Sequence, residues 1–188
     1  MITEIVTTRK KIVGILLVFL SWGWLFAIPF IPLTSNKAVN FHFPVEGVVQ
    51  YLLVFFGYPG CSTVCPVTLK TLAHVYTDYG KIYQDEALKV VFVNLELGMT
   101  AEVSMRYAKH FHPDFLGYHL SKRQLNQLMD ELGVSFFKYD GQEPLHTSYI
   151  YLLERQLAGW KMKYVYSQPN LVESNLMNDL RVLKSRRY

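Results

Sequence analysis

The sequence lacks several features that would point to common classes of enzyme or binding protein. It contains no internal repeat, no low-complexity tract and no glycine-rich phosphate loop, and no serine, histidine and aspartate stand in a recognisable catalytic pattern. Asp130 and Glu131 are neighbours, but they fit the solvated face of a helix better than a pair of catalytic carboxylates. At 188 residues, the chain is long enough to form a single domain of ordinary size with a hydrophobic core.

Net charge is also small. The formal charge is +4, and the first 33 residues supply +2 of it, so the remainder of the chain carries only +2. Nucleic-acid binding depends on neutralising many phosphates with a basic face. The sequence therefore gives no support to nucleic acid as a partner.

One long apolar run stands near the start of the chain. Residues 12–33 contain no charged side chain, and at about 1.5 Å per helical residue they would reach roughly 33 Å, enough for a bilayer core of about 30 Å. A cleaved signal peptide would have a shorter apolar region followed by a small-x-small site. Ile31-Pro32-Leu33 offers no such site, so the sequence favours an uncleaved transmembrane anchor.

Positive residues set the expected orientation. Arg9, Lys10 and Lys11 precede the apolar run, and such residues remain on the cytoplasmic side. We therefore expect a single-pass protein of the cell membrane with its C-terminal part on the exported, periplasmic or equivalent side. The expected divisions are a cytoplasmic N-terminus at 1–11, an anchor at 12–33, a linker at 34–47 and one domain at 48–188.

Only two cysteines are present, and they lie close together. Residues 51–56 (YLLVFF) read as a strand buried on both faces, residues 57–60 as a tight turn, and residues 67–79 as a helix. Cys61 and Cys65 are thus expected at a helix N-terminus, where the dipole favours a thiolate. Spacing of four permits either a disulfide or two thiolate ligands for one soft metal ion. An exported domain lies where disulfides persist, so the pair can be oxidised there.

The remaining pattern alternates strands and helices. An α/β class with a parallel sheet and an antiparallel closing hairpin is expected, which is the thioredoxin-like plan of a central sheet flanked by helices. Residues 35–47 could add a short edge strand around Phe41. The expected strands are 88–95, 117–120, 134–139, 147–153 and 160–166, and the expected helices begin at Thr100, Ser121 and Asn170.

A third ligand would have to be one of six histidines. His146 stands in a loop just before an apolar strand whose start, in a thioredoxin-like sheet, lies beside the first helix. His110 and His112 end a helix, where cations are favourable, and a structural role suits them better. The remaining histidines, His42, His74 and His119, have no context that points to a metal.

These residues resemble the Sco/SenC family. FFGYPGCSTVCPVTL at 55–69 is similar to that family's F-x-F-G-Y-x-x-C-x-x-x-C-P-x-x-L, and the resemblance continues through 106–115 and 146–152. It implies a membrane-anchored thioredoxin-like domain that binds copper through Cys61, Cys65 and His146. It also implies a partner, either the copper-site subunit of a respiratory oxidase such as cytochrome c oxidase or another copper-binding protein. At residues 94–100 this chain has NLELGMT where the family usually has an acidic D-P-x-x-D-T-type segment.

Three functions are compatible with this pattern. The favoured one is copper delivery, because mixed sulfur and nitrogen ligands suit Cu(I) and Cu(II) and because a structural zinc site would normally need a fourth ligand. The second is a thiol–disulfide oxidoreductase that keeps partner cysteines reduced, with Cys61 and Cys65 as its redox pair. C-x-x-x-C differs from the usual C-x-x-C of general thioredoxins. A thiol peroxidase ranks lowest, because no activating arginine accompanies one cysteine.

Overall fold

The computed structural model describes residues 36–138, 144–167 and 172–186. None of the helices in these ranges is both long and apolar enough to cross a bilayer. The anchor expected at 12–33 lies outside the described residues and stays a prediction.

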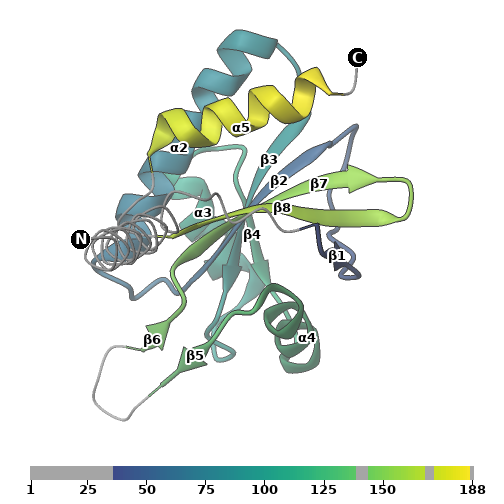
Figure 1. Ribbon diagram of the computed structural model, residues 1–188. Coiled ribbons are helices and arrows are strands. Elements are labelled where there is room, and N and C mark those ends of the chain that lie inside the picture. Colours follow the sequence, from purple (N-terminus) through teal and green to yellow (C-terminus); the bar gives the residue numbers. More distant parts are fainter. Residues whose placement is uncertain (1–35, 139–143, 168–171, 187–188) are drawn as a thin grey trace, which may run out of the picture. The chain divides into compact units, whose positions relative to one another are not determined.

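A six-stranded mixed sheet forms the centre of the folded unit, with the order β1-β8-β7-β2-β3-β4 (Figure 1). Strands β2, β3 and β4 are parallel, whereas β7 is antiparallel to β2 and β8 is antiparallel to β7, so the expected closing hairpin is confirmed. The strands are β1 (Ala38–Val39), β2 (Tyr51–Gly57), β3 (Leu88–Asn94), β4 (Leu116–His119), β7 (Tyr149–Gln156) and β8 (Gly159–Ser167).

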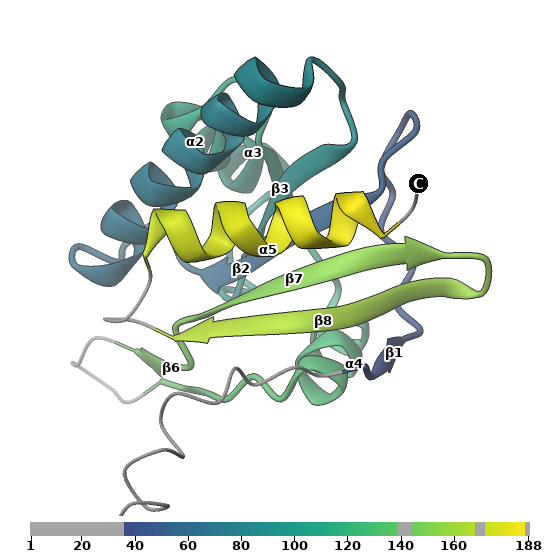
Figure 2. The same cartoon turned by 45° about the horizontal axis from the view of Figure 1, so that its top comes forward.

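Helices cover both faces of this sheet (Figures 1 and 2). Apolar residues of α2, α3 and α5 share one buried cluster, whereas those of α4 belong to the cluster on the other face. The helices are α2 (Val64–Tyr83), α3 (Ala101–Phe111), α4 (Lys122–Leu132) and α5 (Glu173–Ser185).

β2 is the strand that positions the site. All seven of its residues are buried, because α2 and α5 cover one face and α4 the other. β2 pairs with β3 and β7 along most of its length, and its carboxyl end, Gly57, is aligned with Asn94. The central apolar strand expected at 51–56 is confirmed, and the chain leaves it at the cysteine turn.

The capping signals of two helices are confirmed. The Thr100 side chain accepts a hydrogen bond from the Val103 N–H, and Ser121 and Gln124 form a reciprocal capping box. α4 ends at Gly133, whose positive φ of 71° suits a residue without a side chain. The start expected for α5 at Asn170 lies outside the described residues.

Residues 36–47, expected as a linker, pack into the core of the folded unit. Val39, Phe41 and Phe43 are buried in the cluster that faces α4, and β1 pairs with β8 at Val39 and Trp160. The edge strand expected around Phe41 is thus present slightly earlier, at Ala38–Val39. This segment is part of the folded unit because alternate residues supply apolar surface that the sheet needs.

A separate two-stranded ribbon lies beside the main sheet. β5 (Phe136–Phe137) pairs antiparallel with β6 (Leu145–His146), and Phe136 is opposite His146. The strand expected at 134–139 is therefore shorter. His146, expected in a loop, belongs to a strand.

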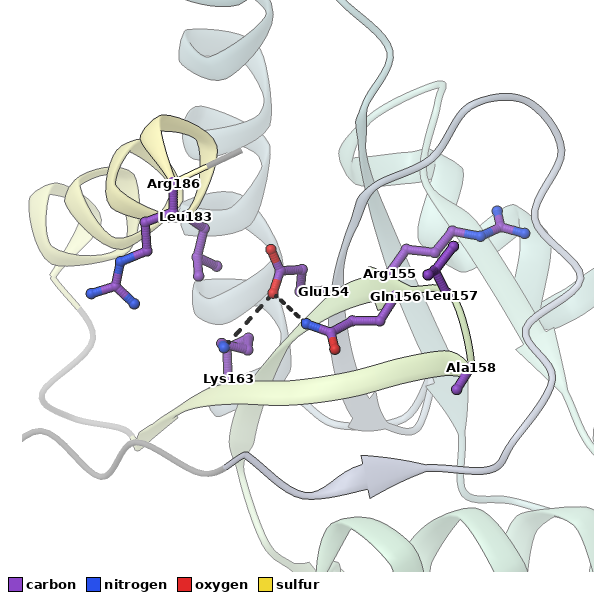
Figure 3. A pocket seen from close by; sticks show the side chains of 8 residues that line it. All are labelled: Glu154, Arg155, Gln156, Leu157, Ala158, Lys163, Leu183 and Arg186. Atoms are coloured by element: carbon purple, nitrogen blue, oxygen red, sulfur yellow. Dashed lines mark hydrogen bonds and ion pairs between the residues drawn. The ribbon is translucent and has the colours of Figure 1, made fainter. Parts of the chain in front are cut away.

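A hollow of about 550 Å³ lies where the β7–β8 turn approaches α5 (Figure 3). Glu154 links two of its other polar residues: its carboxylate accepts a hydrogen bond from Gln156 Nε2 at 3.2 Å and is 3.7 Å from the ammonium of Lys163. Glu154 is aligned with Tyr51, at the start of β2, so this hollow lies at the opposite end of that strand from the cysteine turn.

Candidate metal centre

The two cysteines occupy the turn from β2 into α2. α2 begins at Val64, three residues before the expected start, so Cys65 lies in its first turn and Cys61 precedes it. The Cys61 N–H donates to the carbonyl of Tyr58 at 3.0 Å, and the Cys65 N–H points to Cys61 Sγ at 3.3 Å. Both thiols are free. The Cys61 sulfur therefore accepts a hydrogen bond from an N–H group in the first turn of α2.

Gly57 leaves space for the sulfur of Cys65. A Cβ atom at this position would be 2.8 Å from Cys65 Sγ and 3.1 Å from Cε2 of Phe92. The first contact is shorter than real Cβ atoms show and the second is tight, so glycine lets the end of β2 approach the thiol this closely. The G in the FFGY motif therefore has a packing reason.

Burial distinguishes the two thiols. Cys65 is fully buried, whereas 7% of Cys61 is exposed. Burial raises the pKa of the Cys65 thiol well above its ordinary value, and a hydrogen bond with Cys61 raises it further. The expectation that the helix N-terminus favours a thiolate is therefore wrong for Cys65 in the metal-free protein, because desolvation outweighs the dipole there.

His146 is held by the ribbon rather than by the main sheet. Its neighbour Thr147 exchanges two hydrogen bonds with Ser135: the Thr147 N–H donates to the Ser135 carbonyl at 2.9 Å, and the Ser135 N–H donates to Thr147 Oγ1 at 3.0 Å. Phe136, which pairs with His146, packs against the core cluster. The histidine backbone is thus fixed to the core through β5.

The imidazole is oriented with one nitrogen towards the sulfur. Nδ1 is 3.3 Å from the carbonyl of Thr147, which can only accept, so Nδ1 carries the hydrogen. Nε2 then presents a lone pair 3.9 Å from Cys65 Sγ, and the Tyr58 ring packs edge-on against the imidazole. Burial lowers the pKa of His146, so the ring is neutral at pH 7. A neutral imidazole whose second nitrogen donates to a carbonyl is the usual form of a metal-ligating histidine.

The three side chains predicted as ligands meet at one place. The sulfurs of Cys61 and Cys65 and a ring nitrogen of His146 all lie within 4.8 Å of one another. Bonds of about 2.3 Å to sulfur and about 2.0 Å to nitrogen, as in zinc sites, place two ligands of a trigonal ion roughly 3.8–4 Å apart. The observed 3.9 Å from Cys65 Sγ to His146 Nε2 therefore fits one ion without large rearrangement.

The other histidines serve elsewhere. His74 Nδ1 pairs with Glu173 at 3.0 Å, and His112 Nδ1 accepts the N–H of Asp114 at 3.2 Å. Within the described ranges, no other group of three or more histidine, cysteine or acidic side chains could hold a metal ion. The structural interpretation of the helix-end histidine His112 fits these contacts.

Sequence reasoning missed two residues that support the site. The sequence pattern places Tyr58 only in the turn, although its carbonyl accepts the Cys61 N–H and its ring packs against His146. Thr147 accepts the imidazole N–H with a backbone carbonyl, a contact that does not depend on residue type. Tyr58 could have been found from its place in the Gly57-Tyr58 pair of the motif, whereas nothing in the sequence marks Thr147.

The chain is similar in sequence to known proteins. A SCO2-like protein of Rickettsia conorii is 25% identical over 134 residues, which span 68% of this chain and 64% of that protein. The chain thus matches just under two thirds of its curated relative.

Two solved structures share the fold. Apo Sco1 from Thermus thermophilus aligns with a TM-score of 0.62 and 27% identity, covering 81% of this chain and 92% of that one. Arabidopsis thaliana ScoI, solved with copper bound, aligns with a TM-score of 0.64 and 20% identity, covering 75% of this chain and 88% of that one. The expected thioredoxin-like α/β class is therefore confirmed for the folded unit.

A family pattern also matches the chain. The pattern described as SCO1/SenC covers residues 46–174, which include β2, the cysteine turn and the ribbon that carries His146. The paired thiols and the histidine all lie within that range. The chain belongs to the SCO1/SenC family.

Proposed function

We propose that this protein binds one copper ion through Cys61, Cys65 and His146 and passes it to a partner. The two sulfurs and the imidazole nitrogen form a mixed soft donor set that suits copper in either oxidation state. Three ligands leave a coordination position open, through which a partner's ligand can enter before the ion leaves. Cys61, the more exposed sulfur, lies on the side from which that exchange would begin.

One observation carries this proposal. His146 is 81 residues from Cys65, yet its free nitrogen faces the sulfur while the other nitrogen is committed to a carbonyl. A histidine that merely filled space would not need this orientation. The copper-bound state of Arabidopsis ScoI, which shares the fold, supports copper as the ion.

Exposed apolar side chains lie on the segments that flank the site. Phe137 and Leu145 form a cross-strand pair on the ribbon, and both are more than half exposed. Leu97 and Met99 are exposed in the loop after β3, which an ion pair of Glu96 with Lys138 at 3.2 Å connects to the ribbon. We infer that this rim receives the partner, the copper-site subunit of a respiratory oxidase or another copper protein.

Residues 94–100, which differ from the usual family segment, belong to the same rim. Asn94 is buried, and its side-chain amide donates to Ser104 at 2.9 Å while its oxygen accepts the Glu96 N–H at 2.9 Å. The segment is thus shaped by an amide that both donates and accepts. We infer that its change alters partner recognition rather than the metal ligands, which lie elsewhere in the chain.

The transmembrane anchor expected at 12–33 has a role in this proposal. We infer that residues 12–33 tether the domain on the exported side of the cell membrane, which places the site near membrane-bound oxidase subunits.

A second function, thiol–disulfide exchange, rests on one specific contact. The Cys65 N–H directed at Cys61 Sγ stabilises the more exposed sulfur as a nucleophile. Attack on a partner disulfide would form a mixed disulfide, which Cys65 would then resolve to leave Cys61–Cys65 oxidised and the partner reduced. This reaction uses both sulfurs but does not need His146 as a ligand.

Copper titration of the reduced full-length chain tests the primary proposal. We expect one copper per chain when both thiols are reduced and loss of binding once they are oxidised to a disulfide, because a disulfide offers no thiolate. Thiol counting before and after titration provides the measurement. Undiminished binding by the oxidised chain would exclude the two sulfurs as ligands.

Copper affinity is expected to rise with pH. Because burial raises the pKa of Cys65, this thiol keeps its proton near pH 7 and must release it when the metal binds. Burial lowers the pKa of His146, so its ring is already neutral at pH 7 and releases no proton there. Each released proton makes the apparent affinity about tenfold higher per pH unit. Competition with a calibrated chelator at pH 6, 7 and 8 measures the slope, and a flat profile would contradict this account.

A further inference from the structure

The ion pair between Glu96 and Lys138 joins two segments that approach the metal centre from different parts of the chain. Lys138 Nζ is 3.2 Å from Glu96 Oε1. Lys138 directly follows β5, whose partner strand β6 carries His146, whereas Glu96 lies in the loop after β3. The two residues are 42 positions apart, so the contact forms only when the chain has folded.

The ribbon that carries His146 needs support at both ends. β5 and β6 have two residues each, and an isolated pair of such short strands is not stable in water. The hydrogen bonds at the base of the ribbon hold the end nearest β7. Phe137 and Leu145, the cross-strand pair next to His146, are more than half exposed and supply little packing. The ion pair of Lys138 therefore holds the second end.

Glu96 is fixed relative to the cysteine turn. Its N–H donates to Oδ1 of the buried Asn94 at 2.9 Å. The preceding residue, Leu95, donates its N–H to the carbonyl of Gly57 at 2.8 Å, and Gly57 is the residue that lies against Cys65 Sγ. Only 17% of the Glu96 side chain is exposed. The carboxylate is thus presented to Lys138 from a backbone that is hydrogen-bonded to the end of β2.

We propose that the Glu96–Lys138 ion pair positions His146 as a copper ligand. It holds the second end of the ribbon against the loop after β3 and so keeps the imidazole Nε2 3.9 Å from the Cys65 sulfur. The inference rests on the proposed copper site and adds no ligand to it, because Glu96 and Lys138 act through the backbone of β5 and β6. It also gives residues 94–100, where this chain differs from the usual family segment, a role in holding the ribbon.

The opposite signs of the two charges make this role testable. If the two groups acted on the bound cation only through their charges, removing the carboxylate would weaken copper binding and removing the ammonium would strengthen it. A positioning pair behaves differently, because loss of either partner releases the ribbon. Both single variants would then bind copper more weakly, and exchanging the two charges would restore the affinity.

Asp78 provides a matched control. It forms an ion pair with Lys81 at 3.1 Å on α2, the helix that contains Cys65. Glu96→Gln and Asp78→Asn each replace one carboxylate of an ion pair by an amide, and only the first removes a contact to the ribbon.

The test compares the reduced full-length wild type with Glu96→Gln, Lys138→Met, the double variant Glu96→Lys with Lys138→Glu, and Asp78→Asn. Cu(I) affinity is measured by chelator competition, and hydrogen exchange of the peptides that contain β5 and β6 is measured on the metal-free chains. We expect Glu96→Gln and Lys138→Met each to weaken Cu(I) binding and to speed this exchange about two- to fivefold, the size typical of an ion pair with an exposed partner. The double variant and Asp78→Asn should match the wild type in both measurements, and urea unfolding should show that all five chains are folded.

The outcomes separate this inference from the proposed function. A wild type that binds no copper overturns the copper site, and the positioning role with it. If the wild type binds copper, stronger binding by Lys138→Met would show that the two groups act only through their charges. Unchanged exchange of the ribbon, or a double variant that binds as weakly as the single ones, would show that the ion pair does not hold the ribbon. Each of these last three results overturns the positioning role while the copper site stands.

Discussion

Cys65→Ser and His146→Ala are each expected to lose tight copper binding, although the two residues lie in different elements, α2 and β6. Four-ligand metal sites bind with about 10–16 kcal/mol, or roughly 3 kcal/mol for each ligand. Removing one of three ligands should therefore weaken binding at least about 100-fold. The loss at Cys65 should be the larger, because a serine hydroxyl is a hard donor that soft metals bind poorly.

His74→Ala is the control for this result. His74 lies on α2, the helix that contains Cys65, but pairs with Glu173 and is largely exposed. It should bind copper as the wild type does. Full copper binding by His146→Ala would remove the imidazole from the site. Disulfide reductase activity retained by that variant would favour the second function.

Gly117→Ala is expected to destabilise the fold by about 3 kcal/mol or more, since overpacking of this severity forces the backbone to move. A Cβ atom on Gly117 would be 2.1 Å from the carbonyl oxygen of Ser104 and 2.6 Å from the Cα of Met105. These atoms belong to the backbone of α3, so no side-chain rotation relieves the clash. β4 and α3 would have to separate, and the buried bond between Ser104 and Asn94 would be strained.

Gly80→Ala is the matched substitution. Gly80 lies inside α2 with open space around its Cα, so the added methyl meets nothing within 4 Å. Alanine in a helix interior is favoured over glycine by about 0.5–1 kcal/mol, so this variant should be slightly more stable than the wild type. Urea unfolding of both variants measures the difference. An unchanged midpoint for Gly117→Ala would show that α3 is not tightly packed on β4.

Sequence patterns over a few residues predicted the helices and strands whose formation depends on neighbours in the chain. The apolar run at 51–56 and the capping residues Thr100 and Ser121 correspond to β2, α3 and α4. The ribbon was harder to predict. β5 and β6 have two residues each, and their pairing depends on packing of Phe136 and on the bonds between Ser135 and Thr147.

The sequence by itself determined the chemistry that is available here: two soft sulfur ligands one helical turn apart, a candidate imidazole, and an apolar strand that leads to them. These properties are local, because they follow from residue type and from spacing over a few residues. Only the tertiary structure decided that His146 faces Cys65 and that burial raises the pKa of the Cys65 thiol. Each of these depends on atoms from segments far apart in the chain, whose separation and solvent exclusion exist only after the sheet and its helices have packed.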